Sequence, residues 1–324
     1  MYPLKRNRRL RSSEAIRSMV REQQLAPSDF IVPLFVVEGS DIKEEIASMP
    51  DYYRMSLEHL KKEVQELWSM GLQTVLLFVI VPDTLKDNKG KEALNPEGLM
   101  QRAIALVKET VPEMTVMTDV ALDPYSSFGH DGIVDKGVIV NDTTVEVLAQ
   151  MALSHAEAGA DFVAPSDMMD GRILAIRSLL EQEGFHNTGI LSYSAKYASG
   201  FYGPFRSALD SAPGFGDKKT YQMDFHNRKE ALVEAELDIE EGADIVMVKP
   251  GIAYLDIIRN LSNHIDVPLA AYQVSGEYAM LKAAAAKGWI EYDAIMYEQL
   301  IAFKRAGASL IATYCAKDAV RILG

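Results

Sequence analysis

Short apolar runs alternate with amphipathic stretches along most of the chain. Eight runs have the length and composition of strands buried on both faces, and they cover residues 30–37, 74–81, 114–121, 161–164, 189–195, 244–248, 268–273 and 309–313. Eight stretches have helical periodicity and cover residues 56–70, 96–111, 142–158, 172–183, 228–241, 252–261, 278–288 and 292–305. Strict alternation predicts a parallel sheet, and eight repeats favour a closed (β/α)8 TIM barrel. An open, doubly wound sheet is the alternative, but the chain has no Gly-x-Gly-x-x-Gly motif.

A weak internal repeat joins four of these helices to the strands that follow them. Gly71, Gly159, Gly242 and Gly307 each stand where a helical stretch ends and an apolar run begins. Glycine ends helices readily because it adopts the left-handed conformation without steric cost. The repeat therefore predicts left-handed glycines at the end of the barrel where helices lead into strands.

Three segments fall outside the regular pattern. Residues 1–12 form a basic N-terminal arm that contains Lys5 and four arginines, followed by a helical pattern over residues 13–21. The arm is either a disordered tail or an extension that lies on an acidic neighbouring subunit, and residues 13–324 form the catalytic barrel domain. Two long loops, residues 122–140 and 197–227, follow strands where barrel enzymes place their chemistry.

Two of the predicted strands end at a lysine. Lys249 follows four consecutive apolar residues and precedes Pro250 and Gly251, which stop the strand and allow a sharp turn. Lys196 ends the strand over residues 189–195 in the same way. Burial and a nearby second cation both lower the pKa of a lysine, so the pair predicts amine nucleophiles that form imines with a ketone or aldehyde. The alternative is that each lysine forms an ion pair with a carboxylate.

The loop after the third strand is rich in acids. Asp119 ends that strand, and Asp123, His130 and Asp131 follow in the loop. Carboxylates suit Mg²⁺ or a substrate ammonium group, and a solvated polar turn is the alternative. His130 is either a hydrogen-bonding loop residue or an acid–base group.

Candidate substrate-binding residues lie in the second long loop and at the ends of two further strands. Arg206, Lys218 and Gln222 lie in the loop 197–227, where cations above a lysine pair would bind substrate carboxylates, Arg206 through two parallel hydrogen bonds. Ser275 and Tyr314 end the seventh and eighth strands, and their hydroxyls would bind another carboxylate or a backbone group.

Composition narrows the possible functions. The chain has 324 residues, is 48% hydrophobic and carries a formal net charge of −13, which argues against general nucleic-acid binding. No apolar run is long enough to cross a membrane. The charged N-terminus is not followed by the apolar segment that a secretory signal requires. Cys315 is the single cysteine, so neither an internal disulfide nor a cysteine-rich zinc site is available. We expect a cytoplasmic protein without nucleic-acid or membrane partners.

Taken together, these motifs resemble the porphobilinogen synthase (5-aminolevulinate dehydratase) family along essentially the whole chain. They are residues 247–251, residues 194–206 and the acidic loop from Asp119. The resemblance implies a TIM barrel whose N-terminal arm embraces a neighbouring subunit in a homo-octamer. It also implies condensation of two 5-aminolevulinate molecules to porphobilinogen with loss of water, in haem and chlorophyll synthesis.

The resemblance assigns roles to individual residues. Lys249 matches the lysine that forms a Schiff base with substrate, and Lys196 matches the second lysine. One carboxylate would be bound by Arg206 and Lys218 with Gln222 beside them, and the other by Ser275 and Tyr314. Relatives often have arginine at position 218, so lysine keeps the charge and loses the paired hydrogen bonds.

The acidic loop departs from the zinc-dependent members, which carry three cysteines there. Those positions are Ala121, Asp123 and Asp131 in this chain, so the resemblance is to the magnesium-type, aspartate-rich subgroup, with Mg²⁺ as cofactor and no active-site zinc. Asp119, Asp123 and Asp131 would hold substrate amino groups or a metal. The family's Mg²⁺ site near a subunit interface has a glutamate that matches Glu234.

Two other classes of function compete with this one. An aldolase-type barrel would need one lysine and a phosphate or pyruvate site, which the lysine pair and two carboxylate clamps disfavour. A barrel without catalysis, serving as a binding scaffold, would not need both lysines together with Arg206, Ser275 and Tyr314. Asp170, before the helix over residues 172–183, is expected to cap that helix.

Overall fold

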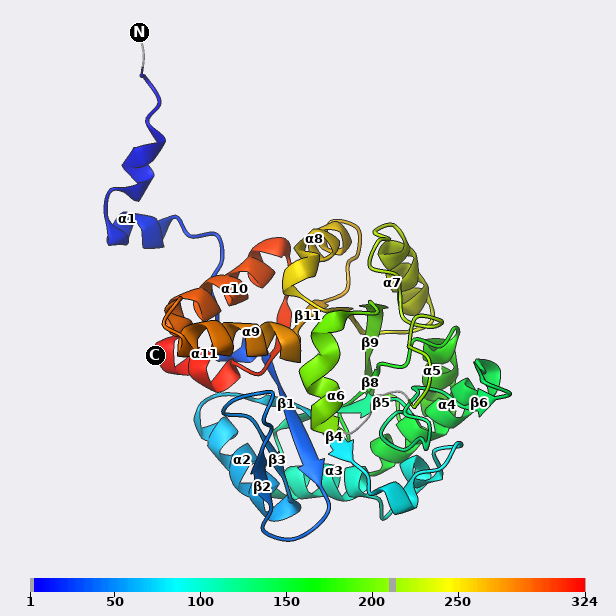
Figure 1. Ribbon diagram of the computed structural model, residues 1–324. Helices are drawn as coiled ribbons and strands as arrows, with labels where there is room; N and C mark the ends of the chain where they lie inside the picture. Colours follow the sequence, from blue (N-terminus) through cyan, green and yellow to red (C-terminus); the bar gives the residue numbers. More distant parts are fainter. Residues whose placement is uncertain (1–2, 210–213, 324) are drawn as a thin grey trace.

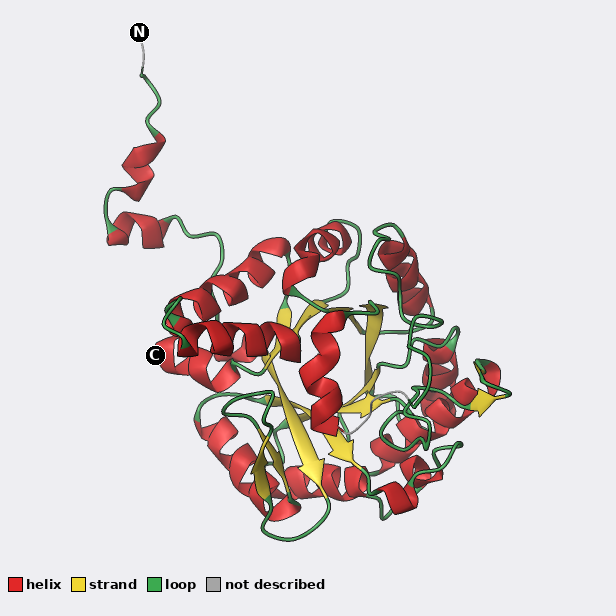
Figure 2. Ribbon diagram, in the orientation of Figure 1, coloured by secondary structure: helices red, strands yellow, loops and turns green. Residues whose placement is uncertain are grey.

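Eight parallel strands close into a barrel in the computed structural model, which describes residues 3–209 and 214–323 (Figures 1 and 2). The strands are β1 (Phe30–Val37), β4 (Thr74–Ile80), β5 (Thr115–Val120), β8 (Phe162–Pro165), β9 (Gly189–Lys196), β10 (Ile245–Lys249), β11 (Leu269–Gln273) and β12 (Leu310–Thr313). They neighbour one another in chain order, and β12 pairs with β1 through Phe30 and Ile311. The predicted TIM barrel and its eight strands are confirmed.

Helices cover the outside of the barrel (Figure 2). The eight predicted helices are present as α2 (Leu57–Ser69), α3 (Leu99–Thr110), α4 (Asp142–Glu157), α5 (Arg172–Gln182), α7 (Glu230–Glu240), α8 (Leu255–Ser262), α9 (Ser275–Ala286) and α10 (Tyr292–Ala306). Two more, α6 (Gly203–Leu209) and α11 (Ala316–Leu323), were not predicted. The Gly203–Pro204 pair that opens α6 reads as a helix breaker, but proline fits the first turn of a helix.

Shorter elements complete the described chain. Four short strands, too brief to carry a sequence pattern, are β2 (Lys43–Glu45), β3 (Tyr53–Met55), β6 (Val134–Asp135) and β7 (Val138–Ile139). The 3₁₀ helices are η1 (Asn7–Arg11), η2 (Pro27–Asp29), η3 (Asp83–Leu85), η4 (Lys91–Leu94), η5 (Gly200–Tyr202) and η6 (Ile252–Tyr254). Within the described ranges, no helix combines the length and apolar character needed to span a membrane.

The four repeated glycines adopt the predicted conformation. Their φ angles are +81° at Gly71, +105° at Gly159, +109° at Gly242 and +115° at Gly307. Each lies between a barrel helix and the next strand, where a left-handed residue turns the chain back. Local sequence therefore sets this end of the barrel, and the opposite end carries the long loops.

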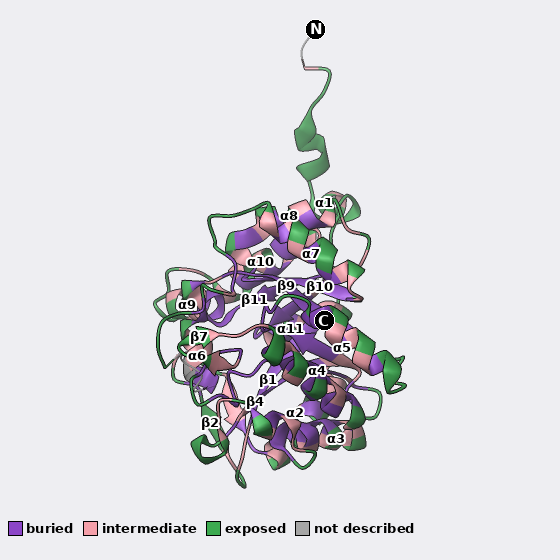
Figure 3. Cartoon of the chain, turned by 90° about the vertical axis from the view of Figure 1, so that its right-hand side faces the viewer, coloured by how far each residue is buried: buried purple, intermediate pink, exposed green. Residues whose placement is uncertain are grey.

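The buried residues concentrate in the barrel and beneath its helices (Figure 3). All five residues of β10 are buried, including its terminal lysine. Near the N-terminus, η1 and α1 (Glu14–Met19) stand away from the barrel (Figure 1), and Leu4, Leu10 and Met19 are exposed there. The predicted division between arm and barrel at residues 12 and 13 stays a prediction.

Candidate active site

The two strand-end lysines are neighbours. In the β9–β10 ladder Lys249 pairs with Lys196, and Val248 pairs with Ala195. Lys249 is 4% exposed and Lys196 is 6% exposed. The two lysines therefore share one rim of the sheet, and both amines lie inside the protein.

Lys249 lies among aromatic rings. Its Nζ is 4.7 Å from the ring centre of Tyr272, 4.8 Å from Phe205, 4.9 Å from Tyr193 and 5.5 Å from Tyr202. Among the residues that the structure describes, no carboxylate lies within ion-pair distance of this Nζ and no hydrogen-bond partner reaches it. Burial, and then the charge of Lys196, lower the pKa of Lys249 to about 7.

Lys196 lies instead in a group of charges. Its Nζ is 3.4 Å from Asp131 Oδ2 and also donates to the carbonyl of Ser166. Lys218 Nζ reaches the other oxygen of Asp131 at 2.5 Å and Asp123 Oδ2 at 3.2 Å. Asp131 is thus shared by two ammonium groups. Burial opposes its ionisation, but Lys218 and Lys196 outweigh burial and lower the pKa of Asp131.

Asp119 differs from Asp131 in the direction in which its pKa is shifted. Burial, and then the charge of Asp123, raise the pKa of Asp119 to about 7. Its Oδ1 is buried without a hydrogen-bond partner among the described residues. Near pH 7 the neutral carboxylic acid at Asp119 and the neutral amine at Lys249 are therefore both well populated, and general acid catalysis of imine formation requires these two forms.

The described parts of the loop 197–227, residues 197–209 and 214–227, cover these groups, and we call them the lid. The cavity between lid and barrel has a volume of about 30 Å³ and is lined by Asp119, Asp123, Ser166, Lys196, Tyr202, Phe205, Arg206, Lys218, Gln222 and Lys249. Arg206 is half-buried on α6, and the side-chain oxygen of Gln222 is buried without a partner in the described structure. A space of this size holds about one water molecule, so a larger substrate requires the lid to move.

His130 fastens the acidic loop to the lid. Its ring nitrogens lie 3.1 Å from the hydroxyl of Tyr221 and 3.0 Å from the carbonyl oxygen of Phe215. Both partners belong to the lid, and His130 is buried. The hydrogen-bonding alternative for this residue is therefore the one that the structure favours.

Neither Ser275 nor Tyr314 lines the cavity between lid and barrel, and Tyr314 lines a different cavity of about 480 Å³. Ser275 Oγ accepts a hydrogen bond of 2.9 Å from the backbone N–H of Phe205. The hydroxyl of Tyr314 lies 3.0 Å from that of Tyr272, whose ring contacts Lys249. Their predicted role as a second carboxylate clamp stays a prediction.

Aromatic residues of the site were missed at the sequence level. In the sequence, Tyr193 and Tyr272 have the pattern of ordinary core residues of two strands. Tyr202 and Phe205 belong to a loop in which only polar side chains are predicted site residues. A signal was available, because each of the four lies within four residues of a predicted site residue or ends a predicted strand. Only the closed barrel shows that they converge on one amine.

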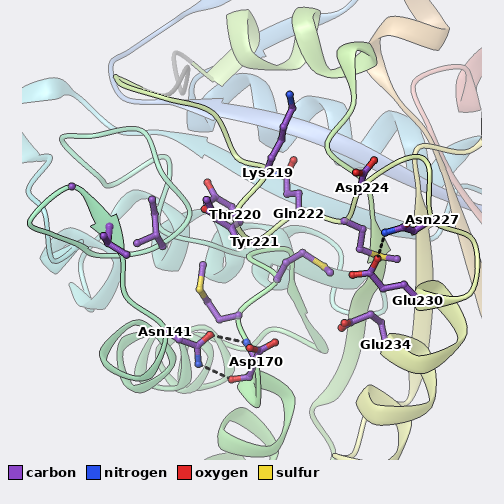
Figure 4. A pocket seen from close by; sticks show the side chains of 16 residues that line it. Asn141, Asp170, Lys219, Thr220, Tyr221, Gln222, Asp224, Asn227, Glu230 and Glu234 are labelled. Carbon is purple, nitrogen blue, oxygen red and sulfur yellow. Dashed lines mark hydrogen bonds between the residues drawn. The ribbon is translucent and has the colours of Figure 1, made fainter.

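Glu234 lies at a second cavity of about 600 Å³, which is shown in Figure 4. Glu230, Asp170 and Asp224 line the same cavity. Burial is the largest factor that raises the pKa of Glu234, and the charges of Asp238, Asp170 and Glu230 add to it while Arg172 opposes it. The described residues include no group of three or more histidines, cysteines or acids arranged to hold a metal ion.

One local prediction is wrong. Asp170 does not cap α5, because Gly171 is the N-cap residue and makes no side-chain bond. The backbone N–H of Asp170 instead donates to Asn141 Oδ1 at 2.8 Å (Figure 4). The carboxylate of Asp170 faces the second cavity. Gly171, in the left-handed conformation, occupies the N-cap position that was predicted for Asp170.

Known proteins resemble the chain over its full length. The sequence profile of the delta-aminolevulinic acid dehydratase family matches residues 4–322. The Bacillus subtilis (strain 168) delta-aminolevulinic acid dehydratase is 54% identical over 318 residues, which is 98% of each chain. The chloroplastic enzyme of Glycine max is 53% identical over 98% of this chain and 78% of its own length.

A solved structure gives the same result. The crystal structure of delta-aminolevulinic acid dehydratase (porphobilinogen synthase) from Toxoplasma gondii ME49, in complex with the reaction product porphobilinogen, matches with a TM-score of 0.97. The identity is 52%, and the match covers 99% of this chain and 92% of that chain.

Proposed function

The chain belongs to the delta-aminolevulinic acid dehydratase family, and on that premise we propose that Lys249 and Lys196 are the two amines through which it joins its substrates. The enzyme is a lyase that condenses two molecules of 5-aminolevulinate to porphobilinogen with loss of water, in tetrapyrrole synthesis. The observation that carries the assignment is the pairing of two buried lysines at adjacent strand ends.

Lys249 is the stronger nucleophile of the pair. Its lowered pKa leaves about half of the amine neutral near pH 7. The neutral amine attacks the ketone carbon of one substrate, and the resulting carbinolamine loses its hydroxyl group as water to give the imine. Asp119, protonated by its raised pKa, supplies the proton that the departing hydroxyl needs.

The charged groups around Lys196 have a positioning role. Lys196 engages the second substrate ketone, and Asp123 and Asp131 bind amino groups in place of the Lys218 ammonium that they hold in this structure. Arg206, Lys218 and Gln222 then bind one substrate carboxylate, and Ser275 and Tyr314 bind the other. Holding two identical molecules in different orientations supplies much of the rate acceleration.

Borohydride trapping with 5-aminolevulinate tests the assignment directly. Reduction of the imines followed by peptide mass spectrometry is expected to give a substrate adduct on Lys249, alone or together with Lys196. Lys108, a partly buried lysine paired with Asp161, is the internal control that stays unmodified. Folded protein that gives no adduct on either strand-end lysine would refute the proposal.

Members of this family depend on metal ions in general, and we propose Mg²⁺ for this chain. Between Asp123 and Asp131 the residues do not fit a metal, because the Lys218 ammonium group lies there. At the second cavity Glu234 fits a Mg²⁺ ion that keeps most of its water, since magnesium commonly binds through one or two carboxylates. An active-site zinc bound by several thiolates is not expected, since Cys315 is the single cysteine of the chain.

Substitution of Glu234 tests the metal assignment. We expect E234A to weaken activation by Mg²⁺ about tenfold and to reduce large assemblies, while the two lysines still form adducts. E236A, on the exposed side of the same helix, is the matched control. Unchanged Mg²⁺ activation and assembly in E234A would refute it.

We also propose a cytoplasmic homo-octamer in which the arm lies on a neighbouring subunit. Supporting it, the arm leaves the barrel (Figure 1) with Leu4 at 80% and Leu10 at 55% exposure. Apolar side chains held this far from their own core are typical of segments that bind another surface. Sedimentation analysis of the protein with and without residues 1–12 would reveal whether assembly depends on them.

A further inference from the structure

The first turn of α9 contacts the beginning of the lid. Ser275 Oγ accepts the backbone N–H of Phe205 at 2.9 Å. A Cβ at Gly276 would lie 2.5 Å from the carbonyl oxygen of Phe201 and 2.9 Å from its Cα. Only glycine therefore lets the lid backbone pack this closely, and the atoms that it packs against belong to main chain that cannot turn aside.

The next residue, Glu277, connects α9 to the turn after Lys249. Its side chain is buried, with Oε1 accepting the N–H of Ile252 at 2.7 Å and Oε2 accepting the N–H of Val274 at 2.9 Å. The bond to Val274 is an ordinary cap at the start of a helix. The bond to Ile252 is not, because it reaches η6, which begins three residues beyond Lys249.

The lid also contacts that turn directly. The hydroxyl of Tyr202 donates to the backbone carbonyl of Lys249 at 3.1 Å. Gly251 lies between Lys249 and Ile252, and a Cβ there would be 2.4 Å from the ring of Phe303 and 2.8 Å from the carbonyl oxygen of Tyr272. Its φ of −104° is open to any residue, so close packing rather than a sharp turn requires glycine here.

We propose that Ser275, Gly276 and Glu277 form a seat that holds the start of the lid and the turn after Lys249 in one arrangement, with Glu277 as the positioning residue for Lys249. This role rests on the proposed imine chemistry of Lys249 and goes beyond it. Lid and amine are separate in sequence, and the seat bonds to the lid through Ser275 and to the turn after Lys249 through Glu277.

The protonation state of Glu277 agrees with this role. Burial raises its pKa to about 7, and the backbone N–H groups of Val274 and Ile252 act against burial. Two N–H donors facing two carboxyl oxygens bind the ionised form best. A glutamine keeps the size of the side chain but turns an NH₂ group toward one of the two donors.

The test compares the two lysines within one protein. Borohydride trapping of folded E277Q with 5-aminolevulinate is expected to lower the adduct on Lys249 about tenfold relative to the adduct on Lys196. E58Q, which changes an exposed acid in the first turn of α2, is the matched control. An unchanged ratio in E277Q would overturn the positioning role, whereas a wild-type protein without adducts would refute the imine chemistry itself.

A second variant tests the lid side of the seat and decides the matter if E277Q does not fold. G276A adds one methyl group against Phe201, and we expect KM for 5-aminolevulinate to rise at least fivefold while kcat falls less. G200A is the control, since a Cβ at that lid glycine meets no described atom within 4 Å. Equal KM values for G276A and G200A would show that the lid does not depend on the seat.

Discussion

Lys249 and Lys196 occupy equivalent positions, yet their surroundings are opposite. Both end adjacent strands, both are almost fully buried, and they are paired in the ladder. Around Lys249 the structure places four aromatic rings, with no carboxylate in ion-pair range among the described residues. Around Lys196 it places Asp131 and the carbonyl of Ser166. Two lysines that are adjacent and almost equally buried therefore have different electrostatic surroundings.

The partners come from distant parts of the chain. Asp131 belongs to the loop after β5, and it also binds Lys218 of the lid. The rings around Lys249 come from β9, β11 and the lid. A charged half and an aromatic half thus meet at one pair of strands. This division suits a reaction that must activate one amine and orient a second, identical substrate.

Removal of each lysine should have the largest effect and should separate the two halves. We expect K249M to lower kcat at least ~10⁴-fold, since no other group replaces the imine-forming amine. K196M should also lower kcat strongly, by ~10³-fold. Steady-state kinetics at saturating 5-aminolevulinate measures both, and a K249M variant with wild-type turnover would contradict the proposed roles.

The same two variants should change stability in opposite directions. The pKa of Lys249 falls from 10.5 to about 7 on folding, so the unfolded chain binds the proton more tightly between these values. The resulting cost to folding is absent above pH 10.5 and complete below pH 7. K249M removes the cost and should raise the free energy of unfolding by about 2 kcal/mol at pH 6, whereas K196M should lower it by about 1 kcal/mol because Asp131 loses a partner. Urea unfolding of the two variants checks the signs.

Substitution of Asp131 should make the surroundings of Lys196 resemble those of Lys249, because Lys196 loses its carboxylate partner. D131N leaves the ammonium groups of Lys196 and Lys218 buried without their shared carboxylate. We expect a loss of about 3 kcal/mol of stability and a several-fold faster acylation of Lys196 by a neutral reagent at pH 7. D135N, at an exposed acid of β6, is the control, and equal stability of the two variants would show that the ion pairs contribute little.

The pH dependence of activity should report Lys249 and Asp119 together. The nucleophile is the neutral amine of Lys249 and the proton donor is the neutral carboxyl group of Asp119, and both groups have a pKa of about 7. Because the amine gains its active form and the acid loses its active form as the pH rises, kcat/KM should pass through a maximum near pH 7 and be about threefold lower at pH 6 and at pH 8. The profile is measured in a buffer series in which the melting temperature confirms folding. A kcat/KM that still rises above pH 9 would mean that Lys249 keeps its charge in spite of burial.

The smallest expected effect of a substitution is at Tyr314, next to the aromatic half. Y314F removes the hydrogen bond to Tyr272, which is worth about 1 kcal/mol. If the hydroxyl also binds a substrate carboxylate, KM should rise about fivefold with kcat nearly constant. Y297F, at a partly buried tyrosine on α10, is the control. Equal KM values would leave Tyr314 with a packing role only.

Local sequence patterns predicted much of the fold correctly. The alternation of buried strands with helices, and the left-handed glycines between them, depend on residues within a few positions of one another. Helix α6 was missed because glycine and proline dominate its start, although proline is acceptable there. Asp170 was placed as a cap because acids prefer that position, but Asn141 from another loop holds its backbone instead.

The pattern of residues along the chain predicts the barrel, the positions of Lys249 and Lys196 at strand ends, and the acids and cations in the loops above them. The groups that surround each amine follow from the closed barrel and could not be predicted in this way. The pairing of Lys196 with Asp131, the aromatic surroundings of Lys249 and the contacts of Glu277 all join segments far apart in the chain. The physical reason is that secondary structure follows from short-range periodicity, whereas the charge of a buried group depends on desolvation and on neighbours that long-range closure brings within a few ångströms.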